Sequence, residues 1–236
     1  MFDILFKHSQ FVVLNKHSGV SVHKDDQDVS LLDAVKAELG VDSLYLVHRL
    51  DKMTSGILIL ALNENAASDL SKNFAERRVE KYYLAISGKK PKKKQGLVAG
   101  DMERSRRSSW KLISSTNNPA VTQFVSMAGE EGQRLFLCKP YTGKTHQIRV
   151  ALRSVGSPIL GDPIYASSEA DRGYLHAYAI RFTLGEEKFS IICNPIKESV
   201  FGDHWRSNAC KDALVHWQSP WSLSWPVIPN KFIVKS

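Results

Sequence analysis

The sequence predicts an α+β fold, in which a few helices lie at the periphery of a mixed β-sheet. Short strand-like runs, such as residues 11–14 and 83–86, alternate with a few stretches of helical period. With 236 residues, 43% of them hydrophobic, the chain can bury a sizeable core. We expect one domain over residues 1–200 and a Trp-rich C-terminal extension over residues 201–236.

The first helix is marked at both ends. Ser30 can cap its start, with Asp33 three residues later, and Gly40 can end it. Its apolar face would hold Leu32, Val35 and Leu39. This pattern predicts a helix that packs on the core.

An uninterrupted apolar run over residues 57–62 predicts a strand that is covered on both faces. His48-Arg49-Leu50-Asp51 and then Lys-Met-Thr-Ser-Gly precede this run directly. Asp51 should therefore stand on a rigid support, which favours catalysis. The spacing leaves another interpretation open, because an Asp before a Thr-Ser-Gly turn often caps its own backbone.

Two further helices are predicted. The second runs from about Glu64 to Arg78, and its apolar stripe would hold Ala67, Leu70 and Phe74. The third should begin with Thr145 as its N-cap and stop at Gly156. It would place Arg149 on its first turn and bury Ile148, Leu152 and Val155.

The charge of the chain indicates a polyanionic partner. Lys and Arg total 32 against 24 Asp and Glu, which gives a net charge of +8 and a pI near 9.3. Nucleic acid fits this balance, and a basic protein that is merely soluble is the alternative. The sequence contains no signal-peptide pattern and no apolar run of transmembrane length, so we expect no membrane contact.

Cys138, Cys193 and Cys210 lie far apart, and none belongs to a Cys-x-x-Cys pair. This pattern predicts neither a disulfide framework nor a zinc site, and it favours a cytoplasmic location. The histidines show no ligand spacing either, so we expect no metal. We interpret three of them as hydrogen-bonding residues: His23, His146 and His176.

The surroundings of Asp51 resemble a known signature. His-Arg-Leu-Asp followed by x-x-Thr-Ser-Gly is similar to that of the RluA-type pseudouridine synthases, which isomerise uridine within RNA. Other segments resemble motifs of this family, in the same order, from residue 1 to about residue 200. They are Leu14–Gly19 (Asn-Lys-Pro-x-Gly, with His17 replacing Pro), Lys81–Ala85 (Lys-x-Tyr-x-Ala), Pro140–Arg149, Gly156–Pro163 and Leu175–Ala177.

The resemblance implies the pseudouridine synthase catalytic fold, a mostly antiparallel mixed β-sheet with peripheral helices. It implies an isomerase that acts on structured RNA, either tRNA or rRNA, and needs no cofactor. We also expect a monomer without an obligatory protein partner or an extra N-terminal RNA-binding domain. A catalytically inactive RNA-binding protein of the same fold is the alternative. A glycosidase is disfavoured, because it would need a second carboxylate near Asp51.

By resemblance, three residues would carry the reaction. Asp51 would be the essential carboxylate, and Arg149 would be the cation that keeps it ionised. An exposed arginine at a helix start would oppose the helix dipole, which also favours pairing with a carboxylate. Tyr83 would stack on the uracil or donate its hydroxyl to the rotating base, although aromatic residues are also common in strands as packing residues.

By the same resemblance, other residues would bind the RNA. Arg49 would fill the gap left by the flipped base, or else hold a phosphate. Ile148 would form an apolar wall against the base, and His48 would orient the turn. From about Ser199 onward the match fades, and the tail has neither helical nor strand period. Its four tryptophans should pack on the domain unless the tail is partly disordered, and a stacking platform for RNA bases is the alternative.

Two basic segments, residues 89–94 and 103–109, are too densely charged to form core. A solvated loop that only aids solubility is one interpretation. The first segment leaves the Tyr83 strand, however, so it should begin near the rim of the active site. We therefore expect Lys92, Lys93 and Lys94 to contact RNA phosphates.

Overall fold

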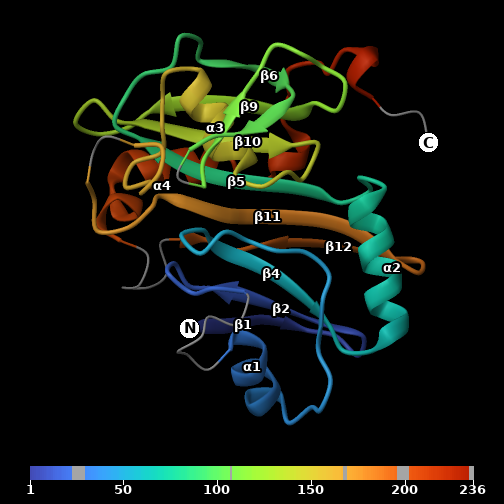
Figure 1. Cartoon of the computed structure of the whole chain (residues 1–236). Helices are drawn as coiled ribbons and strands as arrows, with labels where there is room; N and C mark the ends of the chain where they lie inside the picture. Colours follow the sequence, from blue (N-terminus) through green and yellow to red (C-terminus); the bar gives the residue numbers. More distant parts are fainter. Residues whose placement is uncertain (23–29, 107, 167–168, 196–201, 234–236) are drawn as a thin grey trace. The chain divides into compact units, whose positions relative to one another are not determined.

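The computed structural model describes residues 1–22, 30–106, 108–166, 169–195 and 202–233 (Figure 1). The chain divides into two compact units, each of which is described by itself. Unit 1 comprises Met1–Val79 and His176–Phe201, and unit 2 comprises Glu80–Leu175 and Gly202–Ser236. The predicted α+β class is confirmed, because both units combine β-sheet with few helices. Among the described residues, no helix is both long and apolar enough to span a membrane.

Unit 1 is built on a mixed sheet. Its strands are β1 (Phe2–Lys7), β2 (Phe11–Lys16), β3 (Tyr45–Leu46), β4 (Ser55–Ala61), β11 (Leu175–Leu184) and β12 (Glu187–Ile192). The order is β1-β2-β4-β11-β12, and β3 pairs with the end of β4. Among the described strands of this unit, only the short pairing of β4 with β11 is parallel, where Ser55 faces His176 and Gly56 faces Ala177. The sheet of this unit is therefore mixed and mostly antiparallel, as predicted.

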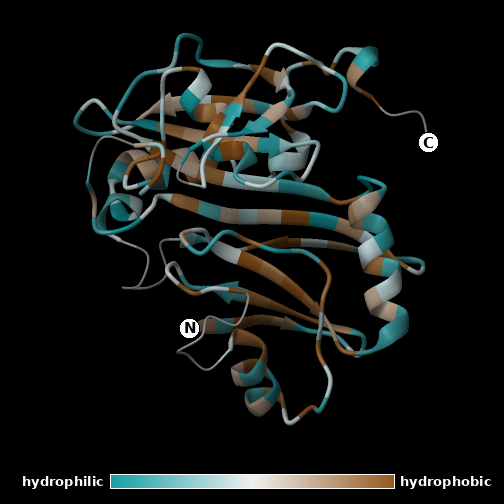
Figure 2. Cartoon of the chain, in the orientation of Figure 1, coloured by the Kyte–Doolittle hydropathy of each residue, from teal (hydrophilic) through white to brown (hydrophobic). Residues whose placement is uncertain are grey.

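The apolar run after Asp51 forms β4, whose residues from Ser55 to Ala61 are all buried. It is coloured brown over most of its length in Figure 2. A strand that is apolar at successive positions has both faces covered, which confirms the prediction for this segment.

Two helices belong to unit 1. Helix α1 (Leu31–Leu39) has its predicted caps: the Ser30 side chain accepts a hydrogen bond from the Asp33 N–H, and Gly40 is left-handed. Helix α2 (Glu64–Ala75) ends three residues before the predicted Arg78, and Arg77 is left-handed with φ 60°. The predicted apolar stripe of α2 is partly wrong, because its buried residues are Ala66, Leu70 and Asn73.

Unit 2 contains an antiparallel sheet of order β5-β10-β9-β6 and a separate hairpin, β7-β8. The strands are β5 (Glu80–Ser87), β6 (Gln95–Gly100), β7 (Met102–Arg104), β8 (Trp110–Leu112), β9 (Ala120–Ala128) and β10 (Arg134–Pro140). Helix α3 (Gln147–Ser154) packs against β8, β9 and β10.

The predicted start of α3 is wrong by one residue. Its N-cap is His146, which is left-handed with φ 57° and makes no side-chain cap bond. The loop before the helix is held instead by the Gln147 side chain. This amide accepts hydrogen bonds from the Thr142 hydroxyl and the Lys144 N–H, and it donates to the Val121 carbonyl.

The C-terminal tail clusters with unit 2, and it contains a helix that the sequence interpretation missed. Helix α4 (Asn208–His216) is capped by Ser207, whose side chain accepts from the Cys210 N–H. Trp205 and Trp217 are buried, and the Trp221 and Trp225 rings contact Tyr82. The apolar period is hard to recognise because a helix of nine residues offers few repeats. The domain boundary at residue 200 stays a prediction.

Candidate active site

In unit 1, half-buried Asp51 begins a tight turn that leads into β4. The turn is closed by the Thr54 N–H, which donates to the Asp51 carbonyl at 2.9 Å. Two carbonyls of the turn are bound by the segment after β2: Gly19 N–H donates to Lys52, and the Ser18 hydroxyl donates to Met53, both at 2.8 Å. The backbone that carries Asp51 is therefore held by its own turn hydrogen bond and by the segment after β2.

Lys16 supports the same turn from inside unit 1, with its side chain fully buried. Its ammonium donates to the carbonyls of His17 at 2.9 Å, Val20 at 2.8 Å and Lys52 at 3.4 Å. These carbonyls offset part of the cost of burying the charge. Lys16 lies in the segment that resembles Asn-Lys-Pro-x-Gly, but sequence reasoning assigned it no role.

His17, which replaces the proline of that motif, has two anchors. Its N–H donates to the Met1 carbonyl at 2.9 Å, a bond that proline could not make. Its Nε2 atom lies 2.9 Å from a carboxylate oxygen of Asp3. The segment thus gains contacts in place of the fixed φ of proline.

A buried histidine joins the start of β4 to β11. Nε2 of His176 lies 2.9 Å from the Cys193 carbonyl, which can only accept a hydrogen bond, so this nitrogen carries a proton. In the neutral ring Nδ1 then accepts from the Ser55 hydroxyl, 2.8 Å away. Gly56 follows with φ 103°, and a Cβ there would lie 2.3 Å from the Ala177 carbonyl oxygen. Only glycine allows this close approach.

His48 and Arg49, two predicted RNA-binding residues, differ in their surroundings. The His48 ring stacks on Phe74 of α2, with 4.5 Å between the ring centroids. Its Nε2 accepts from the Ile59 N–H at 2.9 Å, in the part of β4 between the pairings with β11 and β3. Arg49 is exposed. His48 therefore holds the segment to β4, while Arg49 can reach a ligand.

In unit 2, Tyr83 lies on β5 opposite Cys138 of β10 and is half-buried. Its neighbour Tyr82 is fully buried, near Trp225 and the Lys139 ammonium. Because side chains alternate along a strand, Tyr83 points to the other face of the sheet, together with Lys81.

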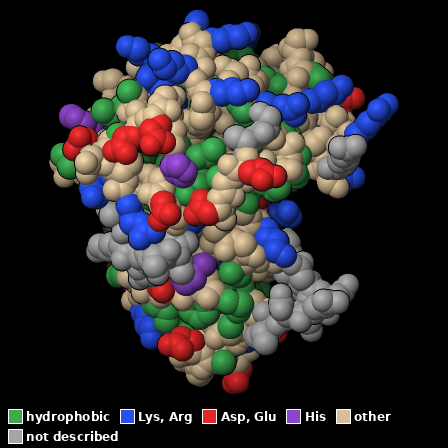
Figure 3. All heavy atoms as spheres, turned by 90° about the vertical axis from the view of Figure 1, so that its left-hand side faces the viewer, with side chains coloured by type: hydrophobic (Ala, Val, Ile, Leu, Met, Phe, Trp, Pro, Cys, Tyr) green, Lys and Arg blue, Asp and Glu red, His purple; other side chains and the backbone are tan. Residues whose placement is uncertain are grey.

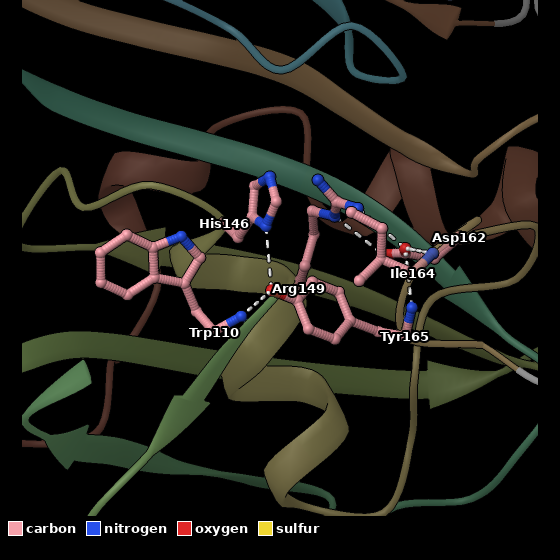
Figure 4. Close-up of polar contacts among 6 residues, drawn as sticks. All are labelled: Trp110, His146, Arg149, Asp162, Ile164 and Tyr165. Carbon is pink, nitrogen blue, oxygen red and sulfur yellow. Dashed lines mark hydrogen bonds and ion pairs between the residues drawn. The ribbon is translucent and has the colours of Figure 1, made fainter. Parts of the chain in front are cut away.

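Arg149 is buried on the first turn of α3, next to buried Ile148. Its guanidinium forms a bidentate ion pair with Asp162 (Figure 4): Nε lies 2.7 Å from Oδ2, and Nη2 lies 2.9 Å from Oδ1. Asp162 belongs to the segment Gly156–Pro163, which resembles a family motif, but the sequence pattern did not indicate this role. A fully buried carboxylate needs a cationic partner. The acid in Gly-Asp-Pro was therefore the one feature of the sequence that could have indicated a partner for Arg149.

The three predicted RNA-contacting lysines of unit 2, Lys92, Lys93 and Lys94, are exposed. The backbone of this loop is nevertheless attached, because the Lys92 N–H donates to the Val155 carbonyl beside α3. Figure 3 shows a face on which Lys and Arg side chains gather over unit 2. The second basic segment includes the last two residues of β7 and the turn before β8, and its Arg107 lies outside the described residues.

The cysteines and histidines of the described chain show no metal-binding arrangement. No group of three or more His, Cys, Asp or Glu residues within it could hold a metal ion. The three cysteines are buried free thiols; burial raises the pKa of Cys210 to about 12 and raises that of Cys138 further. His146 and His176 make hydrogen bonds, in line with their interpretation, whereas His23 lies outside the described residues.

The structure thus describes the predicted site residues in two groups. Unit 1 holds Asp51, His48 and Arg49, and unit 2 holds Tyr83, Ile148, Arg149 and the three lysines. In unit 1 the turn that carries Asp51 is held through its backbone, and in unit 2 the Arg149 guanidinium is held by the Asp162 side chain.

Three comparisons relate the chain to known proteins. A family model described as RNA pseudouridylate synthase matches residues 10–154. An "Uncharacterized RNA pseudouridine synthase" of Haemophilus influenzae is 48% identical over 207 residues, which cover 84% of this chain and 92% of the relative. The "Dual-specificity RNA pseudouridine synthase RluA" of Escherichia coli is 34% identical over 195 residues, covering 76% and 86%. The solved structure of "Human RNA Pseudouridylate Synthase Domain Containing 1" has a TM-score of 0.74 and 26% identity, covering 96% and 97%.

Proposed function

The chain belongs to the RNA pseudouridylate synthase family, and we propose that it isomerises specific uridines of structured RNA, tRNA or rRNA, through Asp51. Its activity is that of an RNA pseudouridine synthase, an isomerase. The strongest support for Asp51 is its position on the braced turn before β4, within the His-Arg-Leu-Asp motif. A nucleophile or base works best when its support does not move.

The reaction moves the uracil from one linkage to another without oxidation or reduction. The bond between N1 and the ribose breaks, the base rotates, and a bond forms between C5 and the same ribose carbon. N1 gains a proton and C5 loses one, so neither a cofactor nor an energy source is required. The Asp51 carboxylate can attack the sugar or the base, or it can remove a proton from the sugar, and each route needs it ionised.

We assign Arg149 the role of the cation that keeps Asp51 ionised. Asp162 accepts hydrogen bonds from two of the five N–H groups of the guanidinium, and this bidentate pair fixes the orientation of Arg149. Tyr83 would stack on the uracil or donate its hydroxyl to it, and Ile148 would form an apolar wall. These roles rest on the family motifs and on the burial of α3.

Other residues, which take no part in the isomerisation, would bind the RNA. Arg49 is exposed, and its planar guanidinium could replace the flipped base in the stack. His48 would keep the preceding segment on β4, and Lys92, Lys93 and Lys94 would bind phosphates. We further propose that the protein is a monomer and needs no protein partner. We also propose that it acts in the cytoplasm, because free thiols such as its three cysteines stay reduced there.

Asp51→Asn tests the proposal. We expect pseudouridine formation in uridine-containing tRNA and rRNA transcripts to fall more than about 10³-fold, because the change removes the charge and keeps the shape. RNA affinity and thermal stability should stay near wild type. Asp69→Asn, an exposed acid of the same unit, changes the net charge equally and should keep full activity.

The same assay separates the alternative functions. An inactive RNA-binding protein would bind transcripts but form no pseudouridine, and a hydrolase would release free uracil. If the Asp51→Asn protein turns over within tenfold of the wild-type rate, Asp51 is not the essential group.

A further inference from the structure

Tyr165 of unit 2 contacts several groups around Arg149 and is almost fully buried, with 5% of its surface exposed. Its hydroxyl accepts the main-chain N–H of Trp110 at 2.8 Å and lies 2.9 Å from Nδ1 of His146 (Figure 4). The guanidinium carbon of Arg149 lies 5.0 Å from the centre of its ring. One side chain thus links a basic hairpin, the start of α3 and the proposed catalytic arginine.

The ring of Tyr165 and the carboxylate of Asp162 restrain the Arg149 guanidinium from different directions. Asp162 binds two nitrogens at the edge of the guanidinium, whereas the Tyr165 ring attracts the cation through its π-electrons. Oδ1 of Asp162 also accepts the main-chain N–H groups of Ile164 and Tyr165. The carboxylate that binds the arginine therefore also fixes the backbone that carries the ring.

The hydroxyl of Tyr165 serves a different contact. The Trp110 N–H that it accepts belongs to the first residue of β8, in the β7-β8 hairpin. This hairpin presents exposed basic side chains, including Arg104 and Arg106. Without the hydroxyl, the half-buried Trp110 N–H would lose its acceptor, and the hairpin would lose the hydrogen bond that adds to its packing against α3.

We propose that Tyr165 is a positioning residue that couples RNA bound on the β7-β8 hairpin to the Arg149 guanidinium. This inference rests on the proposed function, in which Arg149 serves the isomerisation. The aromatic ring sets the position of Arg149, and the hydroxyl sets the position of the hairpin. Loss of the ring should therefore slow the chemical step, and loss of the hydroxyl should weaken RNA binding.

Two substitutions separate these effects, measured with a transcript that the wild-type enzyme modifies. Tyr165→Phe keeps the ring, so the single-turnover rate at saturating RNA should stay within about twofold of wild type, while Kd rises about three- to tenfold. Tyr165→Leu also removes the ring, and the saturated rate should fall about tenfold. In a protein with Arg104 and Arg106 replaced by Ser, Tyr165→Phe should raise Kd no further.

Tyr174 is a matched control in the same unit. It is fully buried, its hydroxyl donates to Asp171, and the guanidinium of Arg172 lies 5.9 Å from its ring. Tyr174→Phe and Tyr174→Leu should lower thermal stability but leave the saturated rate and Kd unchanged. Equal kinetic losses in the Tyr174 variants would show that the Tyr165 effects are merely structural and would overturn the proposal.

Arg149→Met separates failure of this inference from failure of the proposed function. If Arg149→Met is impaired while both Tyr165 variants match wild type in rate and Kd, Tyr165 is not a positioning residue and Arg149 keeps its role. A fully active Arg149→Met protein would refute the role of Arg149 itself, and with it this inference. If Tyr165→Leu does not fold, the Kd of Tyr165→Phe decides, because an unchanged value overturns the coupling.

Discussion

At the scale of single residues, each of the two groups of proposed site residues contains a key residue that is held by contacts within its own unit. Asp51 needs Gly19 and Ser18 to hold its turn, and Arg149 needs Asp162 to hold its guanidinium. The Arg149–Asp162 pair is almost completely buried, with side-chain exposures of 4% and 0%. Removing one member of such a pair leaves a buried charge without its partner, which costs more than the pair itself contributes.

Arg149→Met should lower both stability and activity, for separate reasons. The orphaned Asp162 carboxylate should reduce the free energy of unfolding by about 3–5 kcal/mol, measured by urea denaturation. Asp51 would lose the proposed cation that favours its ionised form. The single-turnover rate at saturating RNA should therefore fall below that of wild type.

The double variant Arg149→Met, Asp162→Asn separates the two effects. Asn removes the orphaned charge, so stability should recover in part, while activity should stay low because the cation is still missing. If activity recovered together with stability, or if Arg149→Met showed full activity, Arg149 would have no catalytic role.

At the scale of elements, β4 is the support on which the Asp51 turn stands. β4 pairs with β2 along one edge. Along its other edge, from its beginning to its end, it contacts first β11, then the His48 ring and finally β3. Its beginning is the most crowded part, because Gly56 approaches the backbone of Ala177. The position of Asp51 therefore depends on a strand contact that tolerates no added methyl group.

Gly56→Ala should disrupt this contact. The methyl group would meet the Ala177 carbonyl oxygen at 2.3 Å, and the residue would also keep a strained φ of 103°. We expect the free energy of unfolding to fall by more than about 3 kcal/mol in urea denaturation.

Gly185→Ala is the matched control, since Gly185 has φ 58° but nothing within 4 Å of its added Cβ. This variant should lose only about 1–2 kcal/mol, the cost of a left-handed alanine. Equal losses in the two variants would mean that backbone strain alone, without the close approach, explains the requirement for glycine at position 56.

At the scale of the whole molecule, charge is the property that bears on RNA binding. The net charge of +8 is unevenly concentrated, because the segment 89–94 contributes five lysines within six residues. The described lysines of this segment are exposed, and the loop backbone is attached beside α3. Such a cluster can bind several phosphates of one RNA at once.

Replacing Lys92, Lys93 and Lys94 with Ser should weaken RNA binding and flatten its salt dependence. Each lost phosphate contact should reduce the slope of log K against log salt by up to about 0.7–0.9. The single-turnover rate at saturating RNA should stay near wild type, because phosphate contacts position the RNA without entering the reaction. Binding titrations at several salt concentrations measure the slope.

Replacing Lys7, Lys72 and Lys188 with Ser removes the same charge from exposed positions of unit 1. This control should affect binding much less. If both triple variants lose the same affinity and slope, only total charge matters; if the Lys92–Lys94 variant equals wild type in both, that loop does not bind RNA.

Local patterns in the sequence were sufficient for the elements that depend on neighbouring residues. The apolar run of β4, the caps of α1 and the motif around Asp51 could all be recognised because their signals lie within about ten residues. The start of α3 was placed one residue too early, and the tail helix α4 was missed. At His146 a left-handed residue replaced the expected Thr145 cap, and in the tail a short helix with scattered tryptophans showed no clear period.

The tertiary structure alone decided which distant groups meet. Asp162 with Arg149, Tyr165 with Trp110, Lys16 with Lys52 and His48 with Ile59 are separated by 11 to 55 residues. No period or capping rule connects such positions, because each contact forms only when whole strands and helices have packed. The sequence therefore identifies which residues can carry the chemistry, whereas the packing of the fold determines which partners hold them. The physical reason is that a buried polar group needs a hydrogen-bonding or charged partner, and only the tertiary structure brings that partner close.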